Sequence, residues 1–175
     1  MRRHLLVVTA LLIAGPALGQ SLSERSGLNT LIGASPSTAD FVKEAAISDM
    51  FELQSSQLAA QRGDEATKTF ATHMLDDHQK TSSDLKAMVQ AGKVKAEIPT
   101  ELDSTHQSKL DKLKGLNGSD FTKQYQSDQV KAHKDAVDLF QRYAKGGDND
   151  ELKAWAGKME PTLAQHLKMA EDLGK

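Results

Sequence analysis

The sequence predicts an all-α protein whose body is a four-helix bundle, and three observations favour this fold class. Four long segments repeat apolar residues at the spacing of an amphipathic helix. Short glycine-containing turns separate the first segment from the second and the third from the fourth, whereas a longer stretch joins the second to the third. Aromatic residues make up only 5 % of the chain, and β-branched residues do not alternate with polar ones as they would in strands.

The first nineteen residues have the features of an export signal. Arg2 and Arg3 precede the apolar run LLVVTALLIAG, and the small residues ALG stand directly before Gln20. The run is shorter than the ~20 residues of a membrane-spanning helix, which favours a cleaved signal over an anchor. We therefore expect a periplasmic protein, cut after Gly19, with no transmembrane span after cleavage.

Composition narrows the function classes further. The chain has no cysteine, so the exported protein must be stabilised by its core rather than by disulfides. The net charge is −2, and removing Arg2 and Arg3 makes it −4. This charge does not fit a nucleic-acid partner. The sequence predicts no particular protein partner.

Residues 20–37 are predicted to form an N-terminal tail, and residues 38–175 to form the helical domain. In the tail, Leu28, Leu31 and Ile32 are expected to pack on the domain. The first long helix should run from 38 to 62, because Ser37 or Thr38 can cap its free amides and Gly63 can end it.

The second long helix should follow from 64 to about 92. The connection after it is interrupted by Pro99 and should contain a short helix over 104–114. The third helix should begin with Ser119 as its cap and end at the KGGDN turn.

The fourth helix should run from about 148–150 almost to the end, with a kink or a break at Pro161. Two helical hairpins joined by a long crossover make the ferritin-like arrangement of a four-helix bundle. A plain up-and-down bundle is the alternative.

A helical wheel predicts one inward-facing ionisable residue on each long helix. These residues are Glu52, His78, His133 and His166. With a rise of ~1.5 Å per residue, the crossover topology places all four within a slab ~7 Å thick. The other two histidines of the domain, His73 and His106, are expected on the surface.

Two arrangements can satisfy four buried polar groups at one level. In the first, three neutral imidazoles and one carboxylate bind a single divalent metal ion such as zinc, iron, copper or manganese. In the second, the same side chains form a structural hydrogen-bond network. A di-iron oxidase is disfavoured, because the chain has no Glu-x-x-His motif and too few inward carboxylates.

Four segments resemble a known family. They are SPSTADFVKEAAISDMFELQSSQLA, FATHMLDDHQKT, DQVKAHKDAVDLF and MEPTLAQHLKMAEDL. They are similar to segments of the domain-of-unknown-function family 4142, and the similarity extends from about Leu28 to Leu173. The resemblance implies a bacterial exported protein with a ferritin-like bundle, although members are often labelled as outer membrane proteins. The family pattern matches Glu52, Asp77-His78, Ala132-His133 and Gln165-His166-Leu167.

The resemblance supplies no activity, so the function has to come from the residues. The first hypothesis is a protein that binds one divalent metal ion inside the bundle through Glu52, His78, His133 and His166. The second is a non-catalytic envelope or stress-related interaction protein in which the histidines form a structural network. No catalytic residues and no organic cofactor site are predicted, and the sequence favours a non-enzymatic role.

Overall fold

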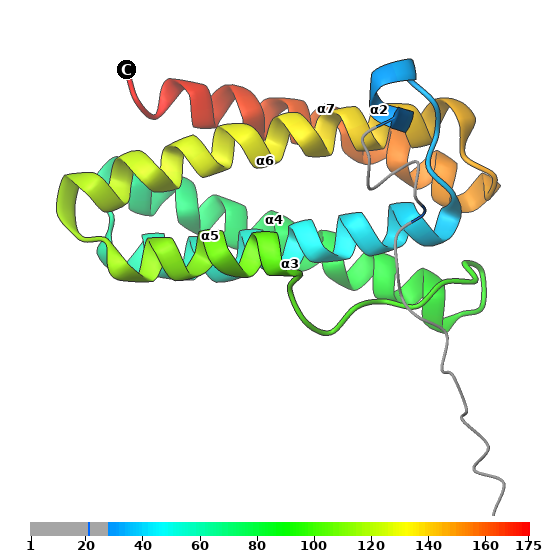
Figure 1. The fold of residues 1–175 in the computed structure, drawn as a ribbon, viewed down its shortest axis with the longest axis horizontal. Coiled ribbons are helices and arrows are strands. Elements are labelled where there is room, and N and C mark those ends of the chain that lie inside the picture. Colours follow the sequence, from blue (N-terminus) through cyan, green and yellow to red (C-terminus); the bar gives the residue numbers. More distant parts are fainter. Residues whose placement is uncertain (1–20, 22–27) are drawn as a thin grey trace, which may run out of the picture.

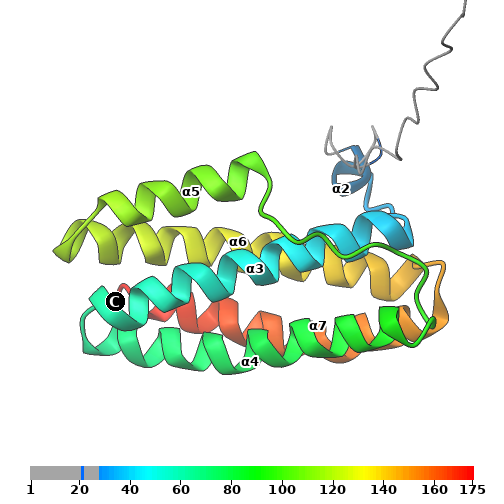
Figure 2. The same ribbon diagram turned by 90° about the horizontal axis from the view of Figure 1, so that it is seen from below.

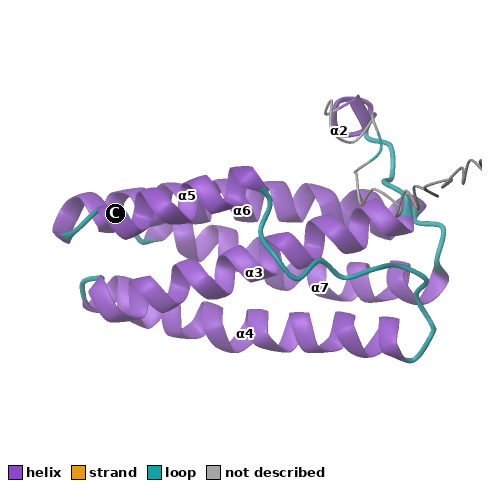
Figure 3. Ribbon diagram, turned by 60° about the horizontal axis from the view of Figure 1, so that its bottom comes forward, coloured by secondary structure: helices purple, strands orange, loops and turns teal. Residues whose placement is uncertain are grey.

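The structure is a computed structural model that describes residue 21 and residues 28–175, and every regular element within these residues is a helix. The predicted signal peptide lies outside the described residues. Figure 3 shows helices joined by loops, and the all-α prediction is confirmed. The helices are α2 (Leu28–Ile32), α3 (Thr38–Arg62), α4 (Glu65–Gln90), α5 (Ser104–Gly115), α6 (Gly118–Gly146) and α7 (Asp150–Asp172).

The four long helices form two antiparallel hairpins, α3 with α4 and α6 with α7 (Figure 1). The connection after α4 returns along the bundle and continues as α5, so α6 starts at the same end as α4 (Figure 2). Helices α4 and α6 therefore run in the same direction. This is the direction change that the predicted crossover requires.

Local sequence explains where the helices begin. The Ser37 hydroxyl accepts from the Asp40 amide, and the Asp64 carboxylate accepts from the Thr67 amide, so both α3 and α4 have side-chain caps. The prediction for the third long helix was wrong at its start. The helix begins at Gly118 after Asn117, which makes no side-chain cap hydrogen bond, and Ser119 already lies inside it.

The last helix continues through Pro161 as one element, without the break that was the alternative to a kink. The proline removes the amide that would bond to the Gly157 carbonyl. Both residues are on the exposed side of α7, where water can satisfy that carbonyl. The proline is therefore tolerated where it stands.

The tail forms the short helix α2, but Leu31 and Ile32 do not pack on the domain. Their exposed fractions are 83 % and 66 %, so the expectation was wrong for these two residues, while the side chain of Leu28 lies outside the described part of the structure. Polar contacts tie the neighbouring segment to the bundle instead. The Arg142 guanidinium donates to the Ala34 carbonyl over 2.8 Å.

The apolar core is divided into two clusters at opposite ends of the bundle. One surrounds Phe41 at the start of α3, where its ring stacks on Tyr143 with centroids 4.1 Å apart. The other surrounds Phe121 near the start of α6 and includes Leu110 and Leu113 of α5. Between the two clusters lies a layer of buried polar residues, which we call the polar level and which includes Glu52, His78, Gln129, His133 and His166. No described helix combines the length and the apolar character needed to cross a membrane.

Candidate metal centre

The polar level contains the four residues that the sequence analysis selected. Glu52 lies on α3, His78 on α4, His133 on α6 and His166 on α7, and each is at most 3 % exposed. All four therefore point into the bundle. The helical wheel was right about their orientation.

The three histidines converge on one point. Their ring centroids are 5.4 to 5.6 Å apart. The His78 and His133 Nε2 atoms are 3.4 Å apart, and one ligand atom from each of the three rings lies within 4.8 Å of the others. We call His78, His133 and His166 the inner cluster. Its geometry can hold a metal ion.

Each histidine of the inner cluster is held by a hydrogen bond on one ring nitrogen. His78 donates from Nδ1 to the Asp49 carboxylate over 2.7 Å, and His166 donates from Nε2 to Asp77 over 2.8 Å. His133 donates from Nδ1 to the Gln129 backbone carbonyl over 2.9 Å. Such outer hydrogen bonds fix ring orientation and tautomer in proteins that bind metals through imidazole.

The opposite ring nitrogens remain available as ligand atoms. His166 Nδ1 is buried and makes no hydrogen bond to the described residues. A neutral His133 that donates from Nδ1 presents a lone pair on Nε2. The three candidate ligand nitrogens are therefore His78 Nε2 and His133 Nε2, which face each other over 3.4 Å, and His166 Nδ1.

Glu52 lies beside the inner cluster but outside the group of mutually close ligand atoms. Its Oε2 accepts a hydrogen bond of 2.6 Å from the Gln129 side chain, while its Oε1 is buried without a hydrogen bond to the described residues. Gln129 thus joins Glu52 to His133, whose Nδ1 donates to the Gln129 carbonyl. The structure therefore brings the three histidines together, whereas the Glu52 carboxylate is linked to them through Gln129.

Burial and neighbouring charge shift the pKa values of this level in different directions. Burial raises the pKa of Glu52 to about 7, although the charge of His78 and the Gln129 hydrogen bond oppose the rise. Burial, together with the charge of His78, lowers the pKa of His133 to about 3. Burial also lowers the pKa of His166 to about 4, against the effect of Asp77. His133 and His166 are therefore neutral near pH 7, as ligands must be.

His78 differs from the other two histidines. Burial alone would lower its pKa, but the hydrogen bond and charge of Asp49, with smaller effects of Glu52 and Asp77, produce a net rise. A cation at His78 is thus favoured by the acidic residues around it. The same negative surroundings would favour a metal cation.

Sequence reasoning missed Asp49 as a site residue and named Asp77 only as part of the family's Asp77-His78 segment. Asp49 is buried, and its second oxygen accepts from the Ser82 hydroxyl over 3.0 Å. Its spacing of three from Glu52 places both acids on one face of α3, which was the available signal. Of the two histidines expected on the surface, His73 is exposed, and His106 is partly covered and bonded to Asp103.

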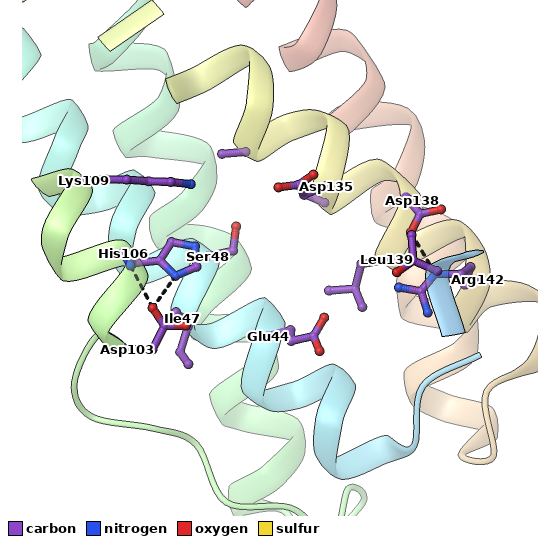
Figure 4. A pocket seen from close by; sticks show the side chains of 13 residues that line it. Glu44, Ile47, Ser48, Asp103, His106, Lys109, Asp135, Asp138, Leu139 and Arg142 are labelled. Carbon is purple, nitrogen blue, oxygen red and sulfur yellow. Dashed lines mark hydrogen bonds and ion pairs between the residues drawn. The ribbon is translucent and has the colours of Figure 1, made fainter. Parts of the chain in front are cut away.

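A separate groove of about 330 Å³ lies between α3, α5 and α6 (Figure 4). Acidic and basic side chains both line it, including Glu44, Lys109, Asp135 and Arg142. None of the inner-cluster histidines is among its lining residues. The buried imidazoles and the groove are therefore two distinct features of the bundle.

Comparison with known proteins places the chain in a family. Residues 29–173 match the family described as Domain of unknown function (DUF4142). The chain belongs to this family. The match covers α3 to α7 entirely, so it includes the inner cluster and its hydrogen-bond partners. No curated protein and no solved structure matches the chain.

Proposed function

We propose that this DUF4142 protein is an exported metal-binding protein whose ferritin-like bundle holds one divalent ion in the inner cluster. The observation that carries the proposal is the convergence of His78, His133 and His166, with ligand atoms within 4.8 Å of one another. Three helices supply these histidines, so folding itself assembles the site.

The spacing of the His78 and His133 ring nitrogens suits a metal better than a direct hydrogen bond. Two nitrogens that each lie 2.0–2.1 Å from a tetrahedral ion are separated by roughly 3.3–3.4 Å. The His78 and His133 Nε2 atoms are 3.4 Å apart. An N–H donor and its acceptor are more often about 2.9–3.0 Å apart. A cation between the rings would also separate lone pairs that otherwise face one another.

Glu52 remains the predicted fourth ligand. Its free Oε1 is buried at the polar level, and its charge already acts on His78. A divalent ion in the inner cluster would favour the ionised carboxylate, because opposite charges attract strongly inside a protein. Glu52 would then reduce the net charge of the bound ion even where Gln129 keeps it at a distance.

The chemistry of the donors narrows the choice of metal. Three imidazoles suit zinc, copper and iron, whereas manganese prefers oxygen ligands. A single carboxylate is also too little charge for two ions. We therefore propose one ion, with zinc, copper or iron preferred over manganese.

Export to the periplasm is part of the proposal and is supported by the sequence of residues 1–19. The ferritin-like arrangement is supported by the parallel directions of α4 and α6 (Figure 1). In ferritin-like proteins, metals bind inside the bundle through side chains from facing helices.

The test uses untagged protein, titrated with zinc and followed by thermal unfolding and by elemental analysis. We expect one equivalent, with stabilisation of about 2.7 kcal/mol when free zinc is a hundredfold above its Kd. His133→Ala should lower both zinc content and the stabilisation. His106→Ala, which changes a histidine outside the inner cluster, should keep both.

The competing function is an envelope interaction protein in which the polar level is a structural network. Its support is the position of His78, which in protonated form could donate from Nε2 to His133 Nε2. This alternative predicts no bound metal after loading with zinc, iron, manganese or copper. Equal metal content in wild type and His133→Ala, measured at a free zinc concentration near the wild-type Kd, would also favour it over the metal site.

A further inference from the structure

A second group of metal-ligand side chains lies where the inner cluster approaches the surface. It consists of His73 and Asp77 on α4 and of His166 on α7. Asp77 Oδ2 is 3.3 Å from His73 Nε2 and 2.8 Å from His166 Nε2. We call His73, Asp77 and His166 the outer cluster. Like the inner cluster, it offers three ligand atoms within 4.8 Å of one another.

Exposure changes in steps across the two clusters. The His73 side chain is 45 % exposed and Asp77 35 %, whereas His166 is 2 % exposed. The inner histidines are buried, so an ion must pass other side chains to reach them. The outer cluster contacts solvent on one side and the inner cluster on the other.

His166 belongs to both clusters. Its ring centroid is 5.5 Å from that of His73 and 5.5 Å from that of His78. Its Nε2 faces Asp77, while its Nδ1 is buried without a hydrogen bond to the described residues. One ring thus presents a different nitrogen to each cluster.

We propose that the outer cluster is an entry subsite, which takes a divalent cation from solvent and passes it to the inner cluster through His166. The transfer step rests on the proposed function, whereas ion binding at the outer cluster does not. Spacing by four residues places His73 and Asp77 on one face of α4, so both can bind one ion. Asp77 also supplies negative charge, which attracts cations to the entrance.

The sharing of His166 makes the two positions alternate. A neutral imidazole has one lone pair, so it can bind a metal through only one nitrogen at a time. With an ion at Nε2, the proton of His166 resides on Nδ1. With an ion at Nδ1, the proton returns to Nε2 and donates to Asp77, as in this structure. The wild-type protein should therefore hold one ion, never two.

The test uses Co²⁺ as the probe and follows both equilibrium binding and the rate of loading of the full protein. His73→Ala and Asp77→Asn should slow loading about tenfold, because the entrance loses a ligand or its charge. The matched controls are Gln79→Ala and Asp76→Asn, two exposed positions on the same helix outside both clusters. They should load at the wild-type rate.

A second arm isolates the outer cluster. His133→Ala removes one inner ligand and should leave a single weaker Co²⁺ equivalent, which His73→Ala in the same background should abolish. The entry subsite would be overturned, with the inner site intact, by the following result. Wild-type protein loads normally, His73→Ala loads as fast as Gln79→Ala, and His133→Ala retains no Co²⁺ equivalent. Binding that depends on His73 but not on His133 would instead overturn the inner site and the transfer.

Discussion

The middle of the bundle differs in kind from its two ends. At the ends, apolar side chains such as Phe41 and Phe121 are fully buried against other apolar groups. In the middle, Glu52, Gln129 and His166 each leave a buried polar atom without a hydrogen bond to the described residues, whereas the ends hold Thr67 Oγ1 and Trp155 Nε1 of this kind beside their apolar clusters. Each such atom costs roughly 1–3 kcal/mol. The ends therefore provide stability, and the middle reduces it.

This difference indicates what the polar level is for. A level that is costly to bury is expected where a protein places a functional site. Each of the three imidazoles has one ring nitrogen held by a hydrogen bond, which leaves the other nitrogen to bind a cation. Changes at the ends should therefore alter stability, whereas changes in the middle should alter metal binding or its dependence on pH.

The largest expected effect comes from Phe41→Ala at the apolar end. Phe41 contacts Tyr143, Phe140 and Trp155, and its loss should cost about 3–5 kcal/mol of unfolding free energy. Zinc affinity should stay at the wild-type value, measured by titration at a temperature where the variant remains folded. A loss of zinc affinity as large as that of His133→Ala would remove the distinction between end and middle.

The next effect concerns the pH dependence of the metal-free protein. The pKa of Glu52 rises from 4.5 to about 7 on folding, so the folded state holds this proton more tightly than the unfolded chain does. The contribution of Glu52 to the free energy of unfolding is therefore fully present below pH 4.5. About 3 kcal/mol of it is lost as the pH rises through about 7.

Glu52→Gln should remove this loss. Urea unfolding at pH 5 and pH 8 would show a variant that is more stable than wild type at pH 8 and close to it at pH 5. Glu97→Gln, at an exposed position in the crossover, serves as the control and should follow wild type. A Glu52→Gln variant that keeps the wild-type slope would show that the carboxylate is not strained by burial.

A smaller effect is expected from the residue behind His78. Asp49→Asn keeps an oxygen that can accept from His78 Nδ1 but removes the negative charge. Zinc affinity should fall about 10- to 100-fold, as for other residues that hold a metal-bound histidine. Asp135→Asn, which alters an exposed acid paired with Lys131, should leave the affinity unchanged. Equal affinities in the two variants would contradict the role of Asp49.

Sequence periodicity was sufficient to find the inward residues. His78, His133 and His166 each lie among apolar residues at helical spacing, and that alone predicts their burial. The connection after α4 is long enough to return along the bundle, and the resulting direction of α6 brings the three rings to one level. These features are local or topological, so the sequence contains them directly.

The contacts around the rings could not be predicted in the same way. Asp77 lies at the edge of its helical face, so whether it meets His166 depends on the rotation of α4 against α7. His73 was expected on the surface, where it is, but its position beside Asp77 and His166 becomes visible only in three dimensions. Helical wheels describe one helix at a time, whereas these contacts join two.

The central claim is that three imidazoles from three helices bind one ion, and X-ray absorption spectroscopy of the zinc-loaded protein measures this directly. The account predicts one equivalent of zinc with three imidazole nitrogens at about 2.0–2.1 Å, and one imidazole fewer in His133→Ala. A zinc shell made mainly of oxygen atoms, or a shell that is identical in wild type and His133→Ala, would contradict it.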